Sequence, residues 1–119
     1  MPVRSLNSAV LRWPTRDETL RAARRWAAEL HRTDANVLRV LCIGSCARGD
    51  YAVGSDIDLI VVVRVAPDSI VDRRRLYEPK GLPVPEDLWV YTVGEFESLA
   101  ATSPSWFKRI RMEALSLVD

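Results

Sequence analysis

Three carboxylates lie at the beginning of apolar segments that predict β-strands. Asp56 and Asp58 open the run DIDLIVVV, and Asp87 opens the run DLWVYT. Because side chains alternate along a strand, Asp56 and Asp58 point to the same face, with their Cα atoms about 6.6 Å apart. Burying a carboxylate is costly without a partner, so the pair either stays at a solvated edge or holds a cation. This spacing suits one divalent ion, or two ions ~3.5–4 Å apart, of a hard type such as Mg²⁺ or Mn²⁺.

The carboxylate pair also indicates a substrate class. Mg²⁺ commonly takes one or two carboxylates and completes its shell with water and substrate phosphate, which points to a nucleotide. If the two strands are neighbours, Asp87 reaches the same ions and is the candidate general base for an attacking hydroxyl, whereas Glu86 would point to the opposite face. We therefore predict catalytic and metal-binding roles for Asp56, Asp58 and Asp87. The alternative is that they are ordinary polar residues at the starts of strands.

Residues suited to phosphate binding precede the second strand. Gly44 ends the first predicted strand and lets the backbone approach a phosphate closely, and Ser45 adds a hydroxyl and an N–H group. Arg48 follows one turn later and suits a charge-assisted contact, although a plain surface arginine is an equal alternative. Ser55 shapes the turn that leads into Asp56. We assign these four residues to a nucleotide-binding loop, the alternative being an ordinary turn.

The elements that must position these residues alternate between helix and strand. A capping box of Thr15 and Glu18 begins a helix that ends near residues 31–34. After it the pattern predicts strands at 36–44, 56–63 and 87–92, a short helix within 45–50 and a helix at 67–78. Two helices follow at 93–102 and 103–118, the second with Ser103 as its cap and Pro104 at its first position. This order predicts an α/β layer, a small sheet with helices packed on it.

Bulk properties fit one domain over residues 1–119 and exclude several classes of protein. Apolar residues make up 48% of the 119 residues, and the formal net charge of +1 argues against direct nucleic-acid binding. Cys42 and Cys46 form neither a disulfide framework nor a metal pattern, which favours a reducing, cytoplasmic location. The first 14 residues lack a signal core, and no apolar run is long enough for a membrane span.

Together these residues resemble a known family. Gly44-Ser45, a gap of ten residues (46–55) and the strand-borne Asp56-Ile57-Asp58 look like the signature of the polymerase-beta-like nucleotidyltransferase superfamily. The fuller string GSCARGDYAVGSDIDLIVVV, with LPVPEDLWVYT downstream, resembles its minimal members, the MNT proteins. A lone Asp-x-Asp would be weak, but the combination is specific.

The resemblance implies an α+β fold with a small mixed β-sheet flanked by helices. It implies that Asp56 and Asp58 hold two Mg²⁺ ions, that Asp87 completes the site, and that Gly44 and Ser45 bind the triphosphate. The implied reaction is in-line attack of a hydroxyl on the α-phosphorus of a nucleoside triphosphate, with release of pyrophosphate.

The resemblance also implies a partner. The acceptor in similar minimal systems is a tyrosine of an all-helical HEPN toxin, which receives AMP from ATP and is thereby silenced, so the chain would act as an antitoxin. Two alternatives stay open: an antitoxin that only masks its toxin, and a small-molecule nucleotidyltransferase resembling aminoglycoside-modifying enzymes. We also expect Trp106 and Phe107 to be exposed aromatic residues, which is compatible with a helical interface in a homo-oligomer.

Overall fold

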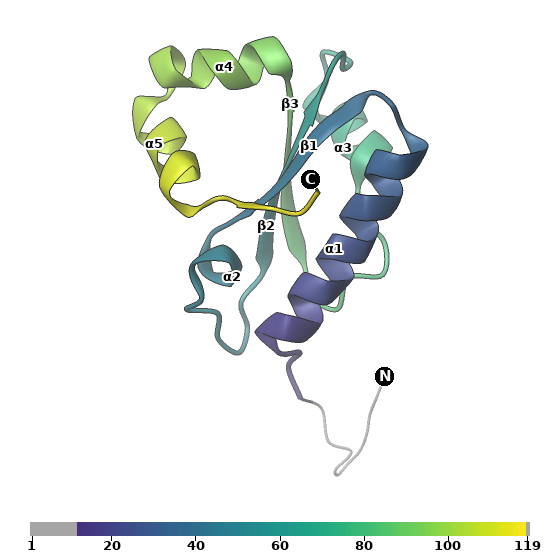
Figure 1. The fold of residues 1–119 in the computed structure, drawn as a ribbon, viewed down its shortest axis with the longest axis vertical. Coiled ribbons are helices and arrows are strands. Elements are labelled where there is room, and N and C mark those ends of the chain that lie inside the picture. Colours follow the sequence, from purple (N-terminus) through teal and green to yellow (C-terminus); the bar gives the residue numbers. More distant parts are fainter. Residues whose placement is uncertain (1–11, 119) are drawn as a thin grey trace.

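The apolar run that follows Asp58 forms an interior strand of a four-stranded sheet (Figure 1). The computed structural model describes residues 12–118, so the segment 1–11, where the sequence predicts no signal core, lies outside the described residues. No helix in this described part is both long and apolar enough to cross a membrane. The elements follow in the order α1 (Arg16–Thr33), β1 (Val37–Ile43), α2 (Ser45–Arg48), β2 (Ile57–Val63), α3 (Ile70–Tyr77), β3 (Glu86–Thr92), α4 (Val93–Thr102), α5 (Pro104–Glu113) and β4 (Leu115–Ser116).

The sheet is mixed and has the strand order β3-β2-β1-β4. β3 runs parallel to β2, whereas β1 runs antiparallel to both β2 and β4. Every residue of β2 except Asp58 is buried, as expected for an interior strand that is covered on both faces. The expected fold, a small mixed sheet flanked by helices, is therefore confirmed.

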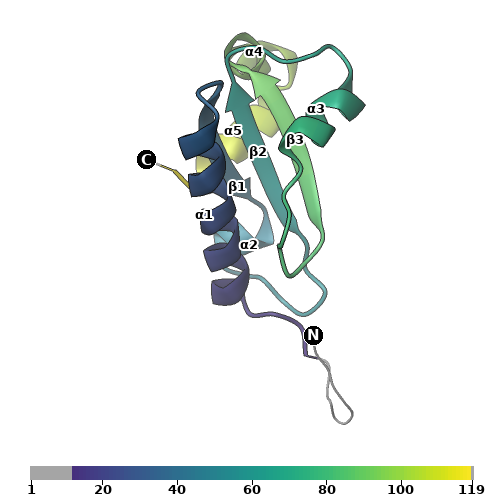
Figure 2. The ribbon, with the colours of Figure 1, turned by 90° about the vertical axis from the view of Figure 1, so that its right-hand side faces the viewer.

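Different helices cover the two faces of the sheet (Figure 2). α1 packs on one face and buries Leu20, Ala23 and Ala27 against it. α4 and α5 pack on the opposite face, where Ile60 and Val62 of β2 belong to a second buried cluster. Because side chains alternate along β2, Asp58 shares the face of Ile60 and Val62, and so points to the side that α5 covers.

The C-terminal region departs from the sequence-based prediction. The pattern predicts a helix over 103–118, but α5 ends at Glu113 and the next residues form β4 on the edge of β1. The Leu117 N–H donates to the Val40 carbonyl oxygen over 2.8 Å. Pairing satisfies backbone groups on the free edge of β1, a long-range gain that helical periodicity cannot reveal.

Of two further expectations about this region, one is confirmed and one is wrong. Ser103 occupies the N-cap position of α5 and Pro104 is its first residue, as predicted, although the Ser103 side chain makes no capping hydrogen bond. Trp106 and Phe107 are half-buried and pack against the second cluster, so the expectation that they are exposed is wrong. Trp106 also donates a hydrogen bond from its indole Nε1 to the Tyr91 hydroxyl over 3.1 Å, which fixes α5 to β3.

Capping boxes fix the starts of two helices. The predicted box of Thr15 and Glu18 begins α1, with both reciprocal bonds present. The sequence also holds an unpredicted box at α4, where Thr92 accepts from the Glu95 N–H and the Glu95 side chain accepts from the Thr92 N–H. Arg73 of α3 adds a two-pronged ion pair to Glu95, with distances of 2.6 and 3.0 Å. Glu95 therefore links α3 to the start of α4.

We expect Glu95→Gln to lower the free energy of unfolding by about 0.5–1 kcal/mol at pH 7, a small effect because the carboxylate is 46% exposed and screened by solvent. The ion pair with Arg73 and the bond from Thr92 lower the pKa of Glu95 to about 2. A lowered carboxyl pKa contributes stability that is complete above the unfolded-state pKa, near 4.5, and is lost as the pH falls towards 2. Urea unfolding at pH 7 and near pH 2.5 should show the wild-type advantage shrinking at the lower pH. Glu97→Gln, an exposed charge on the same helix, should show no such advantage at either pH.

Candidate active site

Two carboxylates are brought together by the parallel pairing of β2 and β3. Asp58 and Asp87 are register partners in that ladder. Neighbouring strands lie about 4.8 Å apart and register partners share a face of the sheet, so both side chains leave the same face at the same end of the sheet. Asp58 is half-buried and Asp87 is exposed. The sequence predicts that Asp58 and Asp87 lie close together only if their strands are neighbours. The pairing of β2 with β3 shows that the strands are neighbours.

Asp56 lies one residue before β2, in the loop that reaches this edge, and is exposed. The Ile57 N–H donates to the Pro85 carbonyl oxygen over 3.0 Å, which joins this loop to the segment that leads into β3. Glu86 pairs in register with Ile57, so it points to the face opposite to Asp87, as predicted.

Asp56, Asp58 and Asp87 concentrate negative charge at this edge of the sheet. Burial raises the pKa of Asp58, the Asp87 and Asp56 carboxylates raise it further, and Arg109 opposes them. Within residues 12–118, no three His, Cys, Asp or Glu side chains converge on a point that would hold a metal by themselves. A pair of carboxylates is nevertheless the usual protein share of a Mg²⁺ site, since water and phosphate supply the other ligands. The donor set therefore fits a hard divalent cation that binds together with a phosphorylated substrate.

Gly44, which follows β1, lies in close contact with the carboxylate of Asp58. Its φ of +79° favours glycine, and a Cβ atom built there would lie 2.3 Å from Oδ2 of Asp58. Only a residue without a side chain leaves room for the Asp58 carboxylate at this point. The sequence predicts Gly44 for close approach of a phosphate, and the structure adds a close approach of Asp58.

The other three residues predicted for the phosphate-binding loop differ in their positions and side-chain contacts. Ser45 begins α2 directly after Gly44, and Arg48 ends it. Arg48 pairs with Asp50 and, over 3.0 Å, with Glu113. Ser55 accepts a hydrogen bond from the Ala52 N–H over 3.0 Å, so its hydroxyl is engaged in closing the turn before Asp56.

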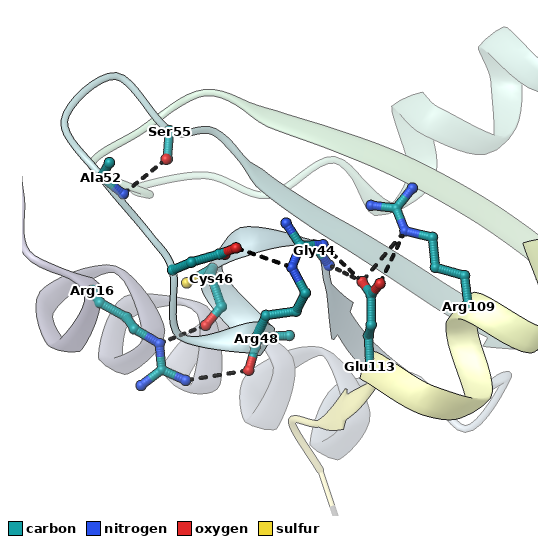
Figure 3. Close-up of polar contacts among 10 residues, drawn as sticks. Arg16, Gly44, Cys46, Arg48, Ala52, Ser55, Arg109 and Glu113 are labelled. Atoms are coloured by element: carbon teal, nitrogen blue, oxygen red, sulfur yellow. Dashed lines mark hydrogen bonds and ion pairs between the residues drawn. The ribbon is translucent and has the colours of Figure 1, made fainter.

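Two residues of α5 that sequence reasoning missed reach the same loop (Figure 3). Glu113 accepts from the Gly44 N–H over 3.3 Å and from Nη1 of Arg48 over 3.0 Å. Arg109 donates from Nε to both carboxylate oxygens of Glu113 over 3.3 and 3.4 Å. The only signal in the sequence is the i, i+4 spacing of Arg109 and Glu113, which is equally typical of a solvated helix face.

Arg16 of α1 anchors α2 from the other side of the loop (Figure 3). Its Nε donates to the Cys46 carbonyl oxygen over 2.6 Å, and its Nη2 donates to that of Ala47 over 3.4 Å. These carbonyls belong to a helix of four residues, too short to satisfy its own last carbonyls. Arg16 is therefore a positioning residue for the loop that begins at Gly44.

We expect Arg16→Met, which keeps an unbranched apolar side chain but removes the guanidinium, to lower the free energy of unfolding by about 1–2 kcal/mol, because a charged donor is lost from two carbonyls. If α2 positions substrate, the KM for the nucleotide should rise more than kcat falls. Thermal unfolding and steady-state kinetics measure the two effects. Arg21→Met on an exposed position of the same helix is the control, and equal behaviour of both variants would contradict this role.

A cavity of about 720 Å³ borders the loop, between α2 and α5. It is basic at one side, where it is lined by Arg48, Lys108 and Arg109, and it also includes Glu113. A cavity of about 750 Å³ lies elsewhere, among α3, β3 and α4, and contains none of the three aspartates. The first cavity is not lined by Asp56, Asp58 or Asp87 either, but it is linked to them through Glu113, which bonds to Gly44, and Gly44 lies against Asp58.

Comparisons with known proteins identify the family of this chain and two solved structures with a similar fold. Residues 23–114 match the family described as the nucleotidyltransferase domain. A solved structure of a putative nucleotidyltransferase from Sulfolobus solfataricus aligns with a TM-score of 0.61 at 23% identity, over 85% of this chain and 80% of the other. A solved toxin-antitoxin structure with AMP-PNP aligns with a TM-score of 0.56 at 18% identity, over 80% of this chain and 72% of the other.

Among curated proteins, none is significantly similar to this chain. At these identities the two solved structures show a shared fold, whereas the family match extends over most of the sequence and includes Gly44, Asp56, Asp58 and Asp87. The chain belongs to the nucleotidyltransferase domain family.

Proposed function

We propose that this protein transfers AMP from ATP to a hydroxyl group of a protein, in a Mg²⁺-dependent reaction. The observation that carries the proposal is the register pairing of Asp58 with Asp87, together with the position of Asp58 beside Gly44, the glycine that follows β1. Asp56, Asp58 and Asp87 would hold Mg²⁺ (or Mn²⁺), which supplies charge neutralisation at the attacking and leaving oxygens. Gly44 and Ser45 would take the triphosphate by backbone approach and hydroxyl contact, with Arg48 adding charge and Ser55 shaping the loop.

The proposed reaction is an in-line displacement at the α-phosphorus of ATP. The acceptor hydroxyl oxygen forms a bond to the α-phosphorus, the bond from that phosphorus to the bridging oxygen breaks, and pyrophosphate leaves. Asp87, exposed near the start of the edge strand β3, accepts the hydroxyl proton as general base. Asp58 is less exposed and lies closer to the loop, which suits it to metal binding.

The acceptor we propose is a tyrosine of a partner toxin of the HEPN type, so that the chain acts as an antitoxin. Support comes from the shared fold with a solved toxin-antitoxin structure that contains AMP-PNP. The cavity beside α2 and α5 is lined by Arg48, Lys108 and Arg109, so the surface beside the predicted phosphate loop is basic.

The test uses ATP labelled at the α-phosphate, Mg²⁺, the purified protein and a lysate of its native organism. The expected result is label on a protein band that is absent with Asp56→Asn and absent when EDTA removes the divalent cation. Label on small molecules alone would favour the metabolite-modifying alternative. A co-purifying partner without label would favour an antitoxin that only masks its toxin.

A further inference from the structure

The carboxylate of Glu113 lies at the centre of a set of anion-binding donors. It accepts from the backbone N–H of Gly44, from the guanidinium of Arg48 and from the guanidinium of Arg109 (Figure 3). The three donors come from the end of β1, from α2 and from α5. Two guanidinium groups and a backbone amide are the groups with which proteins bind phosphate.

The carboxylate of Glu113 is more buried than the guanidinium groups that contact it. The side chain of Glu113 is 18% exposed, less than its partners Arg48 at 38% and Arg109 at 45%. Burial alone raises the pKa of a carboxyl, but the hydrogen bonds from Arg48 and Gly44 outweigh it and lower the pKa of Glu113. The donors are therefore already satisfied by an internal negative charge at neutral pH.

The negative charge of Glu113 lies close to the predicted metal ligand Asp58, because both residues contact Gly44. Gly44, whose N–H bonds Glu113, is also the residue whose missing Cβ leaves room for Oδ2 of Asp58. A triphosphate whose α-phosphorus lay at the Asp58–Asp87 edge would extend past Gly44, which lies against Asp58. Its β- and γ-phosphates would then reach the N–H and guanidinium groups that Glu113 now holds, and like charges cannot share them.

We propose that Glu113 occupies the polyphosphate donors in the nucleotide-free protein, and that binding of the nucleotide displaces its carboxylate. The inference rests on the proposed function, because it takes the nucleotide site to be at Gly44 and Asp58. Glu113 is the last residue of α5, so rotation of its side chain at a helix end is sufficient to free the donors. The consequence is selectivity by charge: a triphosphate carries enough negative charge to displace one carboxylate, whereas weakly charged anions do not.

The alternative role for Glu113 predicts the opposite sign. If its carboxylate served to hold Arg48 in place for substrate, its removal would weaken binding. If the carboxylate of Glu113 competes with the substrate, its removal strengthens the binding of the triphosphate. The binding of weakly charged phosphates is strengthened as well. The direction of the change therefore decides between the two roles.

The experiment is calorimetric titration of the full chain with inorganic tripolyphosphate, and separately with ATP, in Mg²⁺. Glu113→Gln removes the charge but keeps the shape of the side chain, and Glu113→Ala removes the side chain beyond Cβ. Glu97→Gln, at an exposed position of α4, repeats the charge change away from the site. We expect both Glu113 variants to bind tripolyphosphate about tenfold tighter than the wild type. Glu97→Gln should stay within about twofold of the wild type, since an exposed charge at a distance is screened.

Unchanged or weaker binding in both Glu113 variants, checked for folding by circular dichroism, overturns the inference. So does a failure of all four proteins to bind tripolyphosphate. The proposed function fails separately: tighter binding in the Glu113 variants without any transfer of AMP would leave the inference standing and remove the proposed reaction. Conversely, AMP transfer that requires Asp56, with no gain of affinity in the Glu113 variants, would support the proposed reaction and overturn the inference about Glu113.

Discussion

Asp58→Asn is expected to reduce nucleotidyl transfer about 10³-fold or more while leaving the protein at least as stable as the wild type. The loss follows because an amide is a neutral and weaker ligand than a carboxylate for a hard divalent cation. The unchanged or increased stability follows from the surroundings of Asp58. Its half-buried charge is opposed by burial and by the carboxylates of Asp87 and Asp56, so its removal relieves repulsion in the metal-free protein.

Opposite effects on activity and stability are typical of a functional site and not of a structural carboxylate. Single-turnover transfer of label from α-labelled ATP measures the first effect, and urea unfolding without Mg²⁺ measures the second. Asp68→Asn, an exposed carboxylate in the loop before α3, is the control and should change neither. An Asp58→Asn protein that loses stability and keeps transfer would assign Asp58 to the fold instead.

Local patterns in the sequence were sufficient for most of the elements and for the chemistry of the aspartates. The alternation of DIDLIVVV predicts that Asp56 and Asp58 share a face, and the position of β2 in the interior of the sheet agrees with its two apolar faces. The pairing of Asp58 with Asp87 depends on which strands are neighbours. That is a long-range property, which the sequence suggests only through the common carboxylate at the start of both strands.

Contributions from the chain termini to the loop could not be predicted in the same way. Glu113 lies 69 residues from Gly44 along the chain, and Arg16 lies 30 residues from Cys46. In the sequence each belongs to a charged helix face, where a solvated role is the default interpretation. The end of α5 at Glu113 depends on the pairing of β4 with β1, so the error about residues 103–118 and the failure to find Glu113 have a common origin.

Gly44→Ala is expected to lower the free energy of unfolding by about 1–3 kcal/mol and to reduce transfer by at least about 100-fold. Two effects add at this position. With a φ of +79° and a ψ of −159°, Gly44 has a backbone conformation that is essentially restricted to glycine. In addition, the new methyl group would lie 2.3 Å from Oδ2 of Asp58, so either the carboxylate or the end of β1 must move.

Gly81→Ala separates these two effects. Gly81 has nearly the same φ, +80°, but a Cβ atom there meets nothing within 4 Å. It should therefore lose some stability from backbone strain alone and keep full transfer per folded molecule. Thermal unfolding and single-turnover transfer, compared at a temperature where both variants are folded, measure the difference. If Gly44→Ala retained transfer to the same degree as Gly81→Ala, the contact between Gly44 and Asp58 would not be needed for the reaction. If only Gly44→Ala lost it, the glycine would be required because it leaves room for the carboxylate of Asp58.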